Sequence, residues 1–345
     1  MNIGMVTRWN VPCGVGIHAE LIGRAWAEMG HKIKIFAPKE WNDPVTAQDE
    51  PYVVRCWGKD EQGQEFIYEE PFLEEDFDVF VVQTMVMSRE QLMKVYPRIK
   101  EKAKTVFVVH DEGLDRGLAQ FSPDAVVCFD ERYKRFLVEA IPEERIHIIP
   151  YPCCPVKHGD KVEARRKLNL SLEKKIVFNF GIGVFRHIHL LPPLERLNHR
   201  HPPMLLTVTW VKDWFDLFDA LKSRYPFIEV RQEPLSTERL YCYLHASDAL
   251  LIHKDSAAGV AVASSVYQCL GSGCPIVVHD VNFFETLGGE VLKYSGFEDL
   301  SDKLESIFQQ KEEVRGTIQA AEAYAEANSG EEIARRFLHL FQSLF

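Results

Sequence analysis

The stretch VAVASSVYQCLGSGCPIVVHD, residues 260–280, contains a helix, a tight turn and a strand in close succession. Residues 263–270 have the apolar spacing of a helix, and Gly271-Ser272-Gly273 is a stop signal for it. Pro275 opens a β-branched run that predicts a buried strand over 275–278. Residues 248–253 predict a second buried strand just upstream. This alternation of strand, helix and strand is the repeating unit of an α/β sheet protein.

The expected helix starts near Ser264 and Ser265, after a glycine-containing loop at 254–259. A helix start with two hydroxyls and free backbone N–H groups attracts anions, and phosphate is the usual anion of α/β proteins. The two serines could instead serve only as helix caps. On these residues alone, both interpretations stay open.

The same alternation extends over the whole chain and predicts two doubly wound parallel sheets. In the first half, strands are expected at 3–7, 31–37, 78–83, 105–109, 125–129 and 146–149, with helices at 17–29, 87–99 and 131–140. Residues 61–78 are acidic and aromatic and predict a loop or a short hairpin. In the second half, strands are expected at 176–180, 205–210, 228–231, 248–253, 275–278 and 291–294, with helices at 191–198, 214–224 and 237–246.

Three prolines within residues 150–155 interrupt the alternation and predict the domain junction. We expect one Rossmann-like domain over 1–150 and a second over 151–328, with a last helix over 329–345 that packs back across the domains. Ligands of such sheets bind outside the carboxyl ends of the strands. The expected architecture therefore places a cleft between two facing domains.

Charge and cysteine content narrow the class of protein. The net charge is −11, and residues 1–150 hold 18 Lys and Arg against 26 Asp and Glu, which argues against a nucleic-acid partner. The eight cysteines are scattered without a Cys-x-x-Cys pair, which indicates reduced thiols and no zinc site. Met1 leads directly into a strand and no apolar run is long enough for a membrane span. We therefore expect a cytoplasmic protein without a transmembrane segment, and peripheral membrane contact stays open.

Three segments together resemble family-4 glycosyltransferases of the GT-B fold. The opening MNIGMVTRWNVPCGVGIHAELIGRAWAEMGHKIKIFAP is similar to their first strand, glycine loop, helix and second strand. VVHDEG, residues 108–113, resembles their strand that ends in His-Asp, and ASDALLIHK with QCLGSGCPIVVHD resembles their donor segment. The resemblance spans nearly the whole chain. It implies a hexosyltransferase that moves a sugar from a nucleotide diphospho-sugar, UDP- or GDP-linked, to a glycan, lipid-linked or small-molecule acceptor.

The resemblance also implies roles for individual residues. The donor diphosphate would sit on the helix start at Ser264 and Ser265, His110 would contact the transferred sugar, and no metal or other cofactor would be needed. The acceptor would be held mostly by the N-terminal domain. Further residues on the donor side are Gly181, Gly183, His187, Lys254, Gln268 and Glu285, and those on the acceptor or cleft side are Gly14, Val15, Gly16 and Asp111. Transfer with retention would proceed by front-face attack, which explains the lack of a nucleophilic carboxylate.

Two positions depart from the pattern of the family. The second of its two donor-side glutamates is Gln268 here, and the first has no clear counterpart. Its Arg–Lys pair after the strand at 176–180 is replaced by Val184 and His187, so Arg186 or Lys254 would supply the charge for the leaving diphosphate. These departures keep two other classes open: a catalytically silent GT-B binding protein and a nucleotide-sugar epimerase.

Most of these residues also have a structural interpretation. Gly14 and Gly16 serve a plain turn as readily as a ligand, since a lone Gly-x-Gly is a weak signal. His18 can be a surface residue of its helix, and His110 a packed structural histidine instead of a proton carrier near neutral pH. Asp111 can cap the next turn.

Overall fold

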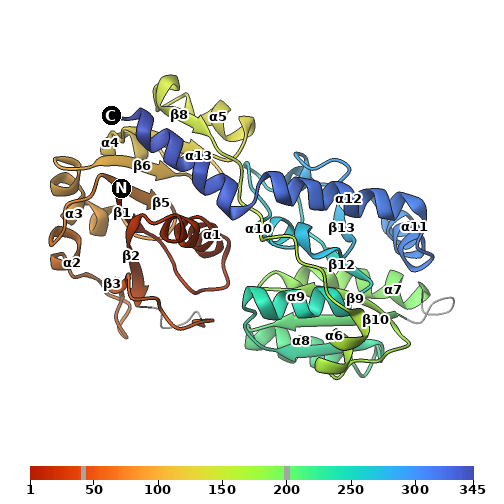
Figure 1. Cartoon of the computed structure of the whole chain (residues 1–345). Helices are drawn as coiled ribbons and strands as arrows, with labels where there is room; N and C mark the ends of the chain where they lie inside the picture. The colour runs from red at the N-terminus through yellow and green to blue at the C-terminus, as the bar shows by residue number, and fades with distance from the viewer. Residues whose placement is uncertain (40–43, 198–202) are drawn as a thin grey trace. The chain divides into compact units, whose positions relative to one another are not determined.

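The computed structural model describes residues 1–39, 44–197 and 203–345, and these divide into two compact units (Figure 1). Unit 1 consists of Met1–Pro152, Ala258–Val262 and Asn328–Phe345, and unit 2 of Cys153–Ala257 and Ala263–Ala327. The first passage of the chain from unit 1 to unit 2 falls inside the proline-rich segment at 150–155.

Unit 1 is built on an eight-stranded sheet of order β4-β3-β2-β1-β5-β6-β7-β8. All neighbouring strands are parallel except β3 and β4, which form an antiparallel pair. The strands are β1 (Asn2–Val6), β2 (Lys32–Lys39), β3 (Val53–Lys59), β4 (Glu65–Ile67), β5 (Val79–Gln83), β6 (Lys104–Val108), β7 (Ala125–Cys128) and β8 (Ile146–Ile148). The winding direction reverses at β1, which lies between β2 and β5, and such a switch point is where ligands of doubly wound sheets bind.

The helices of unit 1 include the last helix of the chain, α13 (Gly330–Ser343), which packs on α1 (Gly14–Glu28). The Trp26 indole N–H donates to the carbonyl of Ala334 at 3.1 Å, and the ring contacts Phe337 and Phe341. The other helices are α2 (Glu70–Leu73), α3 (Arg89–Lys100), α4 (Leu118–Phe121), α5 (Glu131–Leu137) and the 3-10 turn η1 (Glu143–Arg145).

Unit 2 is built on a six-stranded, wholly parallel sheet of order β11-β10-β9-β12-β13-β14. Its strands are β9 (Lys175–Phe180), β10 (Pro203–Thr209), β11 (Ile228–Gln232), β12 (Ala249–Ile252), β13 (Ile276–His279) and β14 (Leu292–Tyr294). Its helices are α6 (Lys161–Lys167), α7 (Leu191–Leu197), α8 (Lys212–Leu221), α9 (Thr237–Ala246), α10 (Ser264–Tyr267), α11 (Phe297–Phe308) and α12 (Glu312–Ala327), with 3-10 turns η2 (Val184–Leu190), η3 (Leu270–Ser272) and η4 (Asn282–Phe284). The prediction of two doubly wound parallel sheets is confirmed.

Apolar strand residues and helix faces form the core of unit 2. Val177, Leu205 and Leu251 point from neighbouring strands into one cluster, which α7, α8 and α11 complete with Leu194, Phe218 and other buried side chains. Hydrophobic residues on the face of a parallel sheet require such a helical cover. Each strand of unit 2 is accordingly followed, after a connecting loop, by a helix or a 3-10 turn.

Several elements differ from the sequence predictions. The strand β3 and the helix α6 lie where none was expected, although Asp160 caps α6 through the backbone N–H of Glu163. The helix expected over 263–270 is a single turn, α10, followed by the 3-10 turn η3. The residue Asn198, which ends the helix expected over 191–198, lies outside the described residues.

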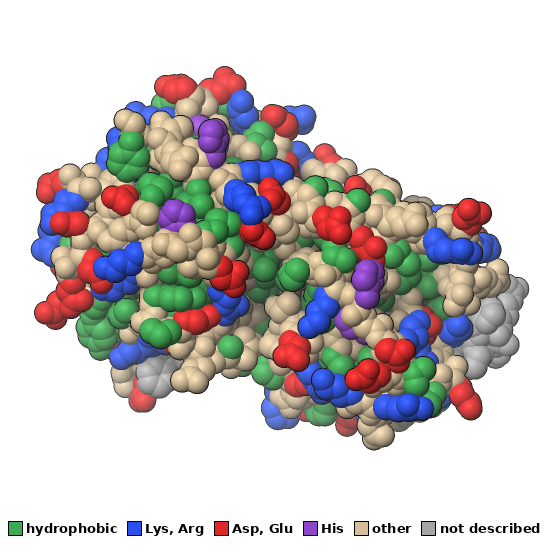
Figure 2. All heavy atoms as spheres, in the orientation of Figure 1, with side chains coloured by type: hydrophobic (Ala, Val, Ile, Leu, Met, Phe, Trp, Pro, Cys, Tyr) green, Lys and Arg blue, Asp and Glu red, His purple; other side chains and the backbone are tan. Residues whose placement is uncertain are grey.

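No helix in the part of the chain that the structure describes is long and apolar enough to cross a membrane. Acidic and basic side chains are interspersed over the face shown in Figure 2. All eight cysteines are free thiols, and six of them are buried.

Candidate functional site

The carboxyl edge of the unit 2 sheet carries a cluster of three ring side chains. His253 follows β12, His279 ends β13 and Tyr294 ends β14, so all three project from adjacent strand ends. The two imidazole rings stack with their centroids 4.6 Å apart, and His253 Nδ1 lies 2.6 Å from the Tyr294 hydroxyl. We call these residues the His–Tyr cluster.

Hydrogen bonding fixes the proton positions in the His–Tyr cluster. Burial, followed by the charge of His279, lowers the pKa of His253 to about 4, and burial raises the pKa of Tyr294. The tyrosine hydroxyl therefore donates to His253 Nδ1, which leaves the proton of that ring on Nε2. His279 Nδ1 lies 2.7 Å from the carbonyl oxygen of Lys254 and donates to it, so the uncharged form of this ring has its lone pair on Nε2. The cluster thus offers one donor and one acceptor to a ligand.

Two cations follow adjacent strands at the same edge. Arg186 comes after β9, where Gly181 adopts a left-handed backbone conformation with φ of +96°, and Lys254 comes after β12. Arg186 Nε lies 3.7 Å from the carboxylate of Asp255, and the Lys254 ammonium lies 4.4 Å from the centroid of the Phe283 ring. Asp255 is 76% exposed, so its ion pair with Arg186 is well hydrated and costs little to exchange for a ligand anion.

Ser264 and Ser265 open α10, but neither is its N-cap. Ala263 occupies the cap position and no side-chain cap bond is formed, so the interpretation of the two serines as caps is wrong. The helix expected over 263–270 has only four residues, Ser264–Tyr267, so few aligned peptide dipoles stand behind its start. Gln268 follows α10 and is 8% exposed. None of these three side chains makes a hydrogen bond to another described residue.

His187 is a structural residue. Its ring is 4% exposed, and burial lowers its pKa to about 4. Nδ1 lies 3.0 Å from the carbonyl oxygen of Val184, and Nε2 lies 3.0 Å from the carbonyl oxygen of Leu251 and 3.1 Å from the backbone nitrogen of His253. Both ring nitrogens are therefore occupied by backbone, and His187 holds η2 against the end of β12 instead of facing a donor.

The remaining donor-side residues lie at the ends of loops. Gly183 is the N-terminal flank of η2, where an added Cβ would lie 3.3 Å from the Arg186 guanidinium. Glu285 is exposed and follows η4. Both positions are compatible with a loop that accommodates a ligand, and their roles stay predictions.

In unit 1, His110 lies just beyond the end of β6 and is bound to Gln83, the last residue of β5. His110 Nε2 and Gln83 Oε1 are 2.6 Å apart, and the Gln83 amide nitrogen faces the sulfur of Met5 at 3.5 Å. The amide oxygen accepts, so the proton of the neutral imidazole lies on Nε2 and Nδ1 keeps a lone pair. Burial lowers the pKa of His110 to about 3. The histidine is thus neutral near pH 7 and can serve as a hydrogen-bond acceptor, not as the proton carrier expected from its ordinary pKa.

His18 is fully buried beside His110, with ring centroids 5.2 Å apart in an edge-on arrangement. Phe129, Tyr151 and Phe337 surround its ring, and neither ring nitrogen has a hydrogen-bond partner among the described residues. Burial, followed by the neighbouring His110, lowers the pKa of His18. The interpretation of His18 as a surface residue is wrong.

The glycine motif forms the first turn of α1, not the expected loop. Cys13 is the N-cap, and its sulfur accepts the backbone N–H of Gly16 at 3.3 Å. An added Cβ on Gly16 would lie 3.1 Å from the carbonyl of Val11, so close packing explains this glycine. The Tyr151 hydroxyl donates to the carbonyl oxygen of Gly14 at 2.6 Å. Val15 lies between the two glycines in the same turn. The N–H of Gly16 is therefore not available to a ligand.

A network of charged side chains holds the loop that leads into α1. Arg24 donates to Glu20, Glu50 and the Asn10 side chain, with distances between 2.7 and 2.8 Å. Arg55 binds Asp49 with two nitrogens and also donates to the carbonyls of Trp9 and Pro38. The left-handed Asn10, with φ of 55°, sits at the centre of this network. These interactions pre-form the strand end next to the switch point.

Asp111, the neighbour of His110, is half-buried. Burial is the main cause that raises its pKa, and a hydrogen bond from Thr84 opposes that shift. Thr84 Oγ1 also accepts the backbone N–H of His110 at 2.8 Å. One threonine therefore ties both residues of the His-Asp pair to the end of β5.

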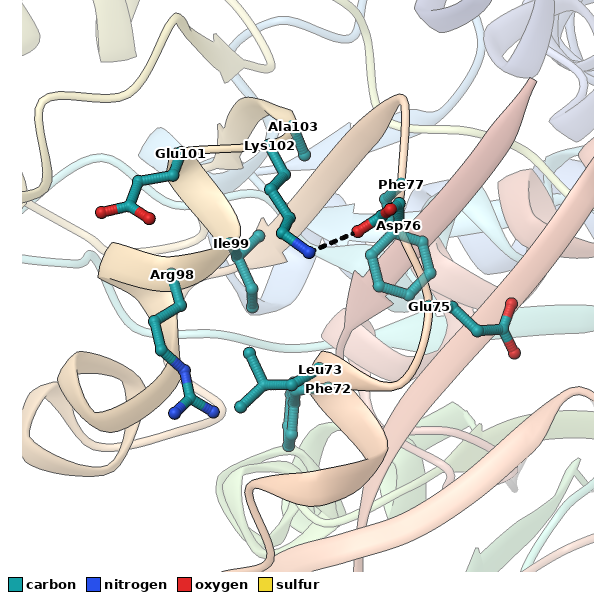
Figure 3. A pocket seen from close by; sticks show the side chains of 10 residues that line it. All are labelled: Phe72, Leu73, Glu75, Asp76, Phe77, Arg98, Ile99, Glu101, Lys102 and Ala103. Carbon is teal, nitrogen blue, oxygen red and sulfur yellow. Dashed lines mark hydrogen bonds and ion pairs between the residues drawn. The ribbon is translucent and has the colours of Figure 1, made fainter.

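Among the hollows of unit 1, two lie at opposite edges of its sheet. One of about 290 Å³ lies at the amino ends of β5 and β6, beneath α2 and α3 (Figure 3). There Lys102 is paired with Asp76, as the dashed line in Figure 3 shows. A larger one of about 580 Å³ lies beside the carboxyl ends of β2 and β3. Within the described ranges, no group of three or more His, Cys, Asp or Glu side chains is placed to hold a metal ion.

Known structures resemble this chain over its entire length, whereas no protein-family profile matches its sequence. Sucrose-phosphate synthase from Thermosynechococcus elongatus is 15% identical with a TM-score of 0.70, over 100% of this chain and 99% of that chain. HepE from Anabaena, solved with UDP-glucose, is 12% identical with a TM-score of 0.70, over 99% and 100%. The pneumococcal O-GlcNAc transferase GtfA, solved with UDP and GlcNAc, is 10% identical with a TM-score of 0.69, over 100% and 99%.

At these identities the similarity establishes the fold and nothing more. The chain has the GT-B fold of these glycosyltransferases, as the sequence resemblance implied. The assignment to family 4 stays a prediction.

Proposed function

We propose that this chain is a glycosyltransferase that moves a hexosyl unit from a nucleotide diphospho-sugar to an acceptor hydroxyl. The observation that carries the proposal is the match to glycosyltransferase structures over 99–100% of each chain, two of them solved with UDP-glucose or with UDP and GlcNAc. Transfer with retention, as in family 4, is the finer form of the proposal. It rests on the sequence resemblance.

The carboxyl edge of unit 2 supplies groups that suit a nucleotide sugar. Arg186 and Lys254 would offset the charge of the leaving diphosphate, because α10 is too short to contribute a large dipole. The His–Tyr cluster presents one donor and one acceptor, which fits a base edge or a sugar hydroxyl. Ser264, Ser265 and Gln268 add polar side chains beside α10 that make no hydrogen bond to another described residue.

In unit 1, the neutral His110 would contribute a hydrogen bond to the transferred sugar through Nδ1. Gln83 holds the ring and its proton in place, so the imidazole needs no reorientation when the sugar arrives. A neutral acceptor at this point would favour a sugar hydroxyl over an anionic group. Asp111 and the first turn of α1 would lie on the acceptor side.

A thermal-shift screen against UDP, GDP, ADP, CMP and their sugar conjugates tests the donor. A ligand that binds only the folded state stabilises it by mass action and so raises the melting temperature. At a ligand concentration of 100 times the Kd, the free energy of unfolding rises by about 2.7 kcal/mol. The double variant Arg186→Gln/Lys254→Gln should lose that shift for the diphosphate ligands. Lys311→Gln, between α11 and α12, is the matched control and should retain it. No shift with any nucleotide at millimolar concentration would overturn the proposal.

The second candidate is a GT-B protein that binds a glycan or a protein without catalysis. Its support is the neutral Gln268 at a position where family 4 has a glutamate, together with the single-turn helix α10. Nucleotide binding without donor hydrolysis or transfer to any acceptor would favour this candidate over the first.

A further inference from the structure

The loop between β12 and α10 belongs in part to unit 1. Residues 258–262 are part of unit 1, whereas the flanking segments Cys153–Ala257 and Ala263–Ala327 are part of unit 2. Connections between a strand and the next helix of such sheets usually have about 2–6 residues. This one runs from His253 to Ala263 without regular secondary structure. A connection longer than the sheet requires is typical of a functional loop.

The first half of this loop is anchored on unit 2. The side-chain amide of Asn282 in η4 accepts the backbone N–H of Ala257 and donates to the carbonyl of the same residue, both at 2.9 Å. His279 donates to the carbonyl of Lys254 at 2.7 Å, and the Lys254 ammonium lies over the Phe283 ring. An amide that pairs with both backbone groups of one residue fixes that residue as a neighbouring strand would. Ala257 is therefore fastened to the segment that follows β13.

The next residues of the loop are anchored within unit 1. The backbone N–H of Val260 donates to the carbonyl of Glu112 at 2.8 Å. An added Cβ on Gly259 would lie 1.9 Å from that carbonyl oxygen and 2.8 Å from its carbon, so only glycine permits this close approach of two backbones. Glu112 lies two residues after His110. The loop is therefore held on the segment that carries His110.

Only Ala258, an exposed residue, separates the two anchors. Consecutive Cα atoms are about 3.8 Å apart, so a single residue gives the chain little slack. A displacement of either anchor is therefore passed on to the other through the backbone, or it breaks a hydrogen bond. We call residues 254–262 the strap, because both of its ends are fastened.

We propose that the strap couples Lys254 to the His110 segment, with Gly259 and Asn282 as its positioning residues. The cation that would meet the diphosphate and the imidazole that would meet the transferred sugar are then joined through one short, fastened piece of chain. Groups that are held before the substrate arrives need no ordering when the reaction begins. This role rests on the proposed glycosyl transfer, whereas the two anchors are present without any ligand.

Hydrogen exchange of the full chain, measured by mass spectrometry, tests the anchors. Gly259→Ala places a Cβ against the Glu112 carbonyl, so the backbone amides of residues 258–262 should exchange about tenfold faster or more. Gly113→Ala is the matched control, because it makes the same change beside Glu112 where an added Cβ meets nothing within 4 Å. Its exchange should equal that of the native chain. Asn282→Ala should likewise speed the exchange of the Ala257 amide.

Steady-state kinetics on the same variants separate positioning from binding. The readout is release of UDP from UDP-glucose or of GDP from GDP-mannose, and calorimetry gives the Kd of UDP and GDP. Gly259→Ala should lower kcat by about tenfold or more, because the His110 segment loses its anchor. The Kd should change by less than about threefold, because Lys254 keeps its own contacts in unit 2. Asn282→Ala should weaken nucleotide binding as well.

Each other result counts against the inference. Unchanged exchange over 258–262 in Gly259→Ala would show that Glu112 does not hold the strap. Faster exchange with an unchanged kcat would leave the strap without a role in transfer and overturn the positioning role. A native chain that binds and turns over no nucleotide sugar overturns the proposed function, and the positioning role with it, even where the exchange confirms both anchors. If Gly259→Ala does not fold, Asn282→Ala decides, and unchanged exchange of its Ala257 amide overturns the inference.

Discussion

One substitution, Gln83→Glu, should change the protonation state of His110. It places a carboxylate where the amide oxygen now lies, 2.6 Å from His110 Nε2. A unit charge pair at that distance interacts by about 6 kcal/mol at an effective dielectric constant of about 20. Burial of the new carboxylate cancels much of this energy, and opposite charges within about 4–6 Å shift a pKa by about 1–3 units. We expect the pKa of His110 to rise from about 3 by that amount.

Two-bond ¹H–¹⁵N correlation spectra of the full chain, labelled at histidine, measure the protonation and the tautomer of His110. In the native chain we expect the Nε2–H tautomer over pH 5–8, and in Gln83→Glu a protonated ring in the lower part of that range. Gln83→Met removes the acceptor without adding a charge and should leave the pKa low. A pKa of His110 that stays near 3 in Gln83→Glu, or an Nδ1–H tautomer in the native chain, would refute the assignment.

Three further predictions concern stability. Gly16→Ala should cost about 1–3 kcal/mol in urea denaturation because its Cβ meets the backbone, whereas Gly316→Ala, in open space within α12, should add about 0.5–1 kcal/mol; equal effects would contradict the packing argument. Arg55→Lys should lower the free energy of unfolding by about 1–3 kcal/mol, because one lysine nitrogen cannot replace the two that bind Asp49 and also reach two carbonyls. An unchanged midpoint in urea would contradict this prediction. Burial lowers the pKa of His187 in the folded chain to about 4, so on acidification the unfolded chain takes up this proton first. The free energy of unfolding should therefore fall as the pH drops from about 6.5 towards 4, by up to about 1.4 kcal/mol per pH unit. A His187→Gln variant with the same pH slope would show that this histidine contributes nothing.

The sheet architecture could be predicted because buried parallel strands are short apolar runs bounded by glycine, proline or polar turns. The segments β9 and β13 are such runs, and both were predicted close to their observed bounds. The strand β3 was missed because its sequence, VVRCWGK, mixes a cation and a glycine into the run. Its pairing with both β2 and the hairpin strand β4 compensates for that weak local pattern.

The helix over 263–270 shows where apolar spacing is misleading. Its Ser, Val, Tyr and Cys residues have low helix propensity, so tertiary packing decides the backbone. Gly271 packs against the carbonyls of Cys154 and Pro155, where an added Cβ would lie 2.9–3.0 Å away. The chain therefore leaves the helical path after one turn, for a reason that the local sequence does not reveal.

The strand ends that carry the candidate site residues could be predicted from the sequence, whereas the binding roles of these residues stay predictions. Lys254 and Arg186 were placed at strand ends, as the alternation of elements allows. The structural role of His187 was not accessible, because it depends on a bond to the backbone of His253, far away in the sequence. The partnership of His253 with Tyr294 was missed for the same reason, although each lies at a predicted strand end.

These differences change how the proposed chemistry would work. A one-turn helix has few aligned peptide dipoles, so the charge of a leaving diphosphate would fall on the side chains of Arg186 and Lys254. Charge from two partly exposed side chains is more sensitive to salt than charge from fixed backbone dipoles, and Arg186 is 37% exposed. Donor affinity should therefore fall steeply with ionic strength, and the slope should flatten in Arg186→Gln/Lys254→Gln. A salt-independent affinity in the native chain would place the diphosphate on backbone N–H groups instead.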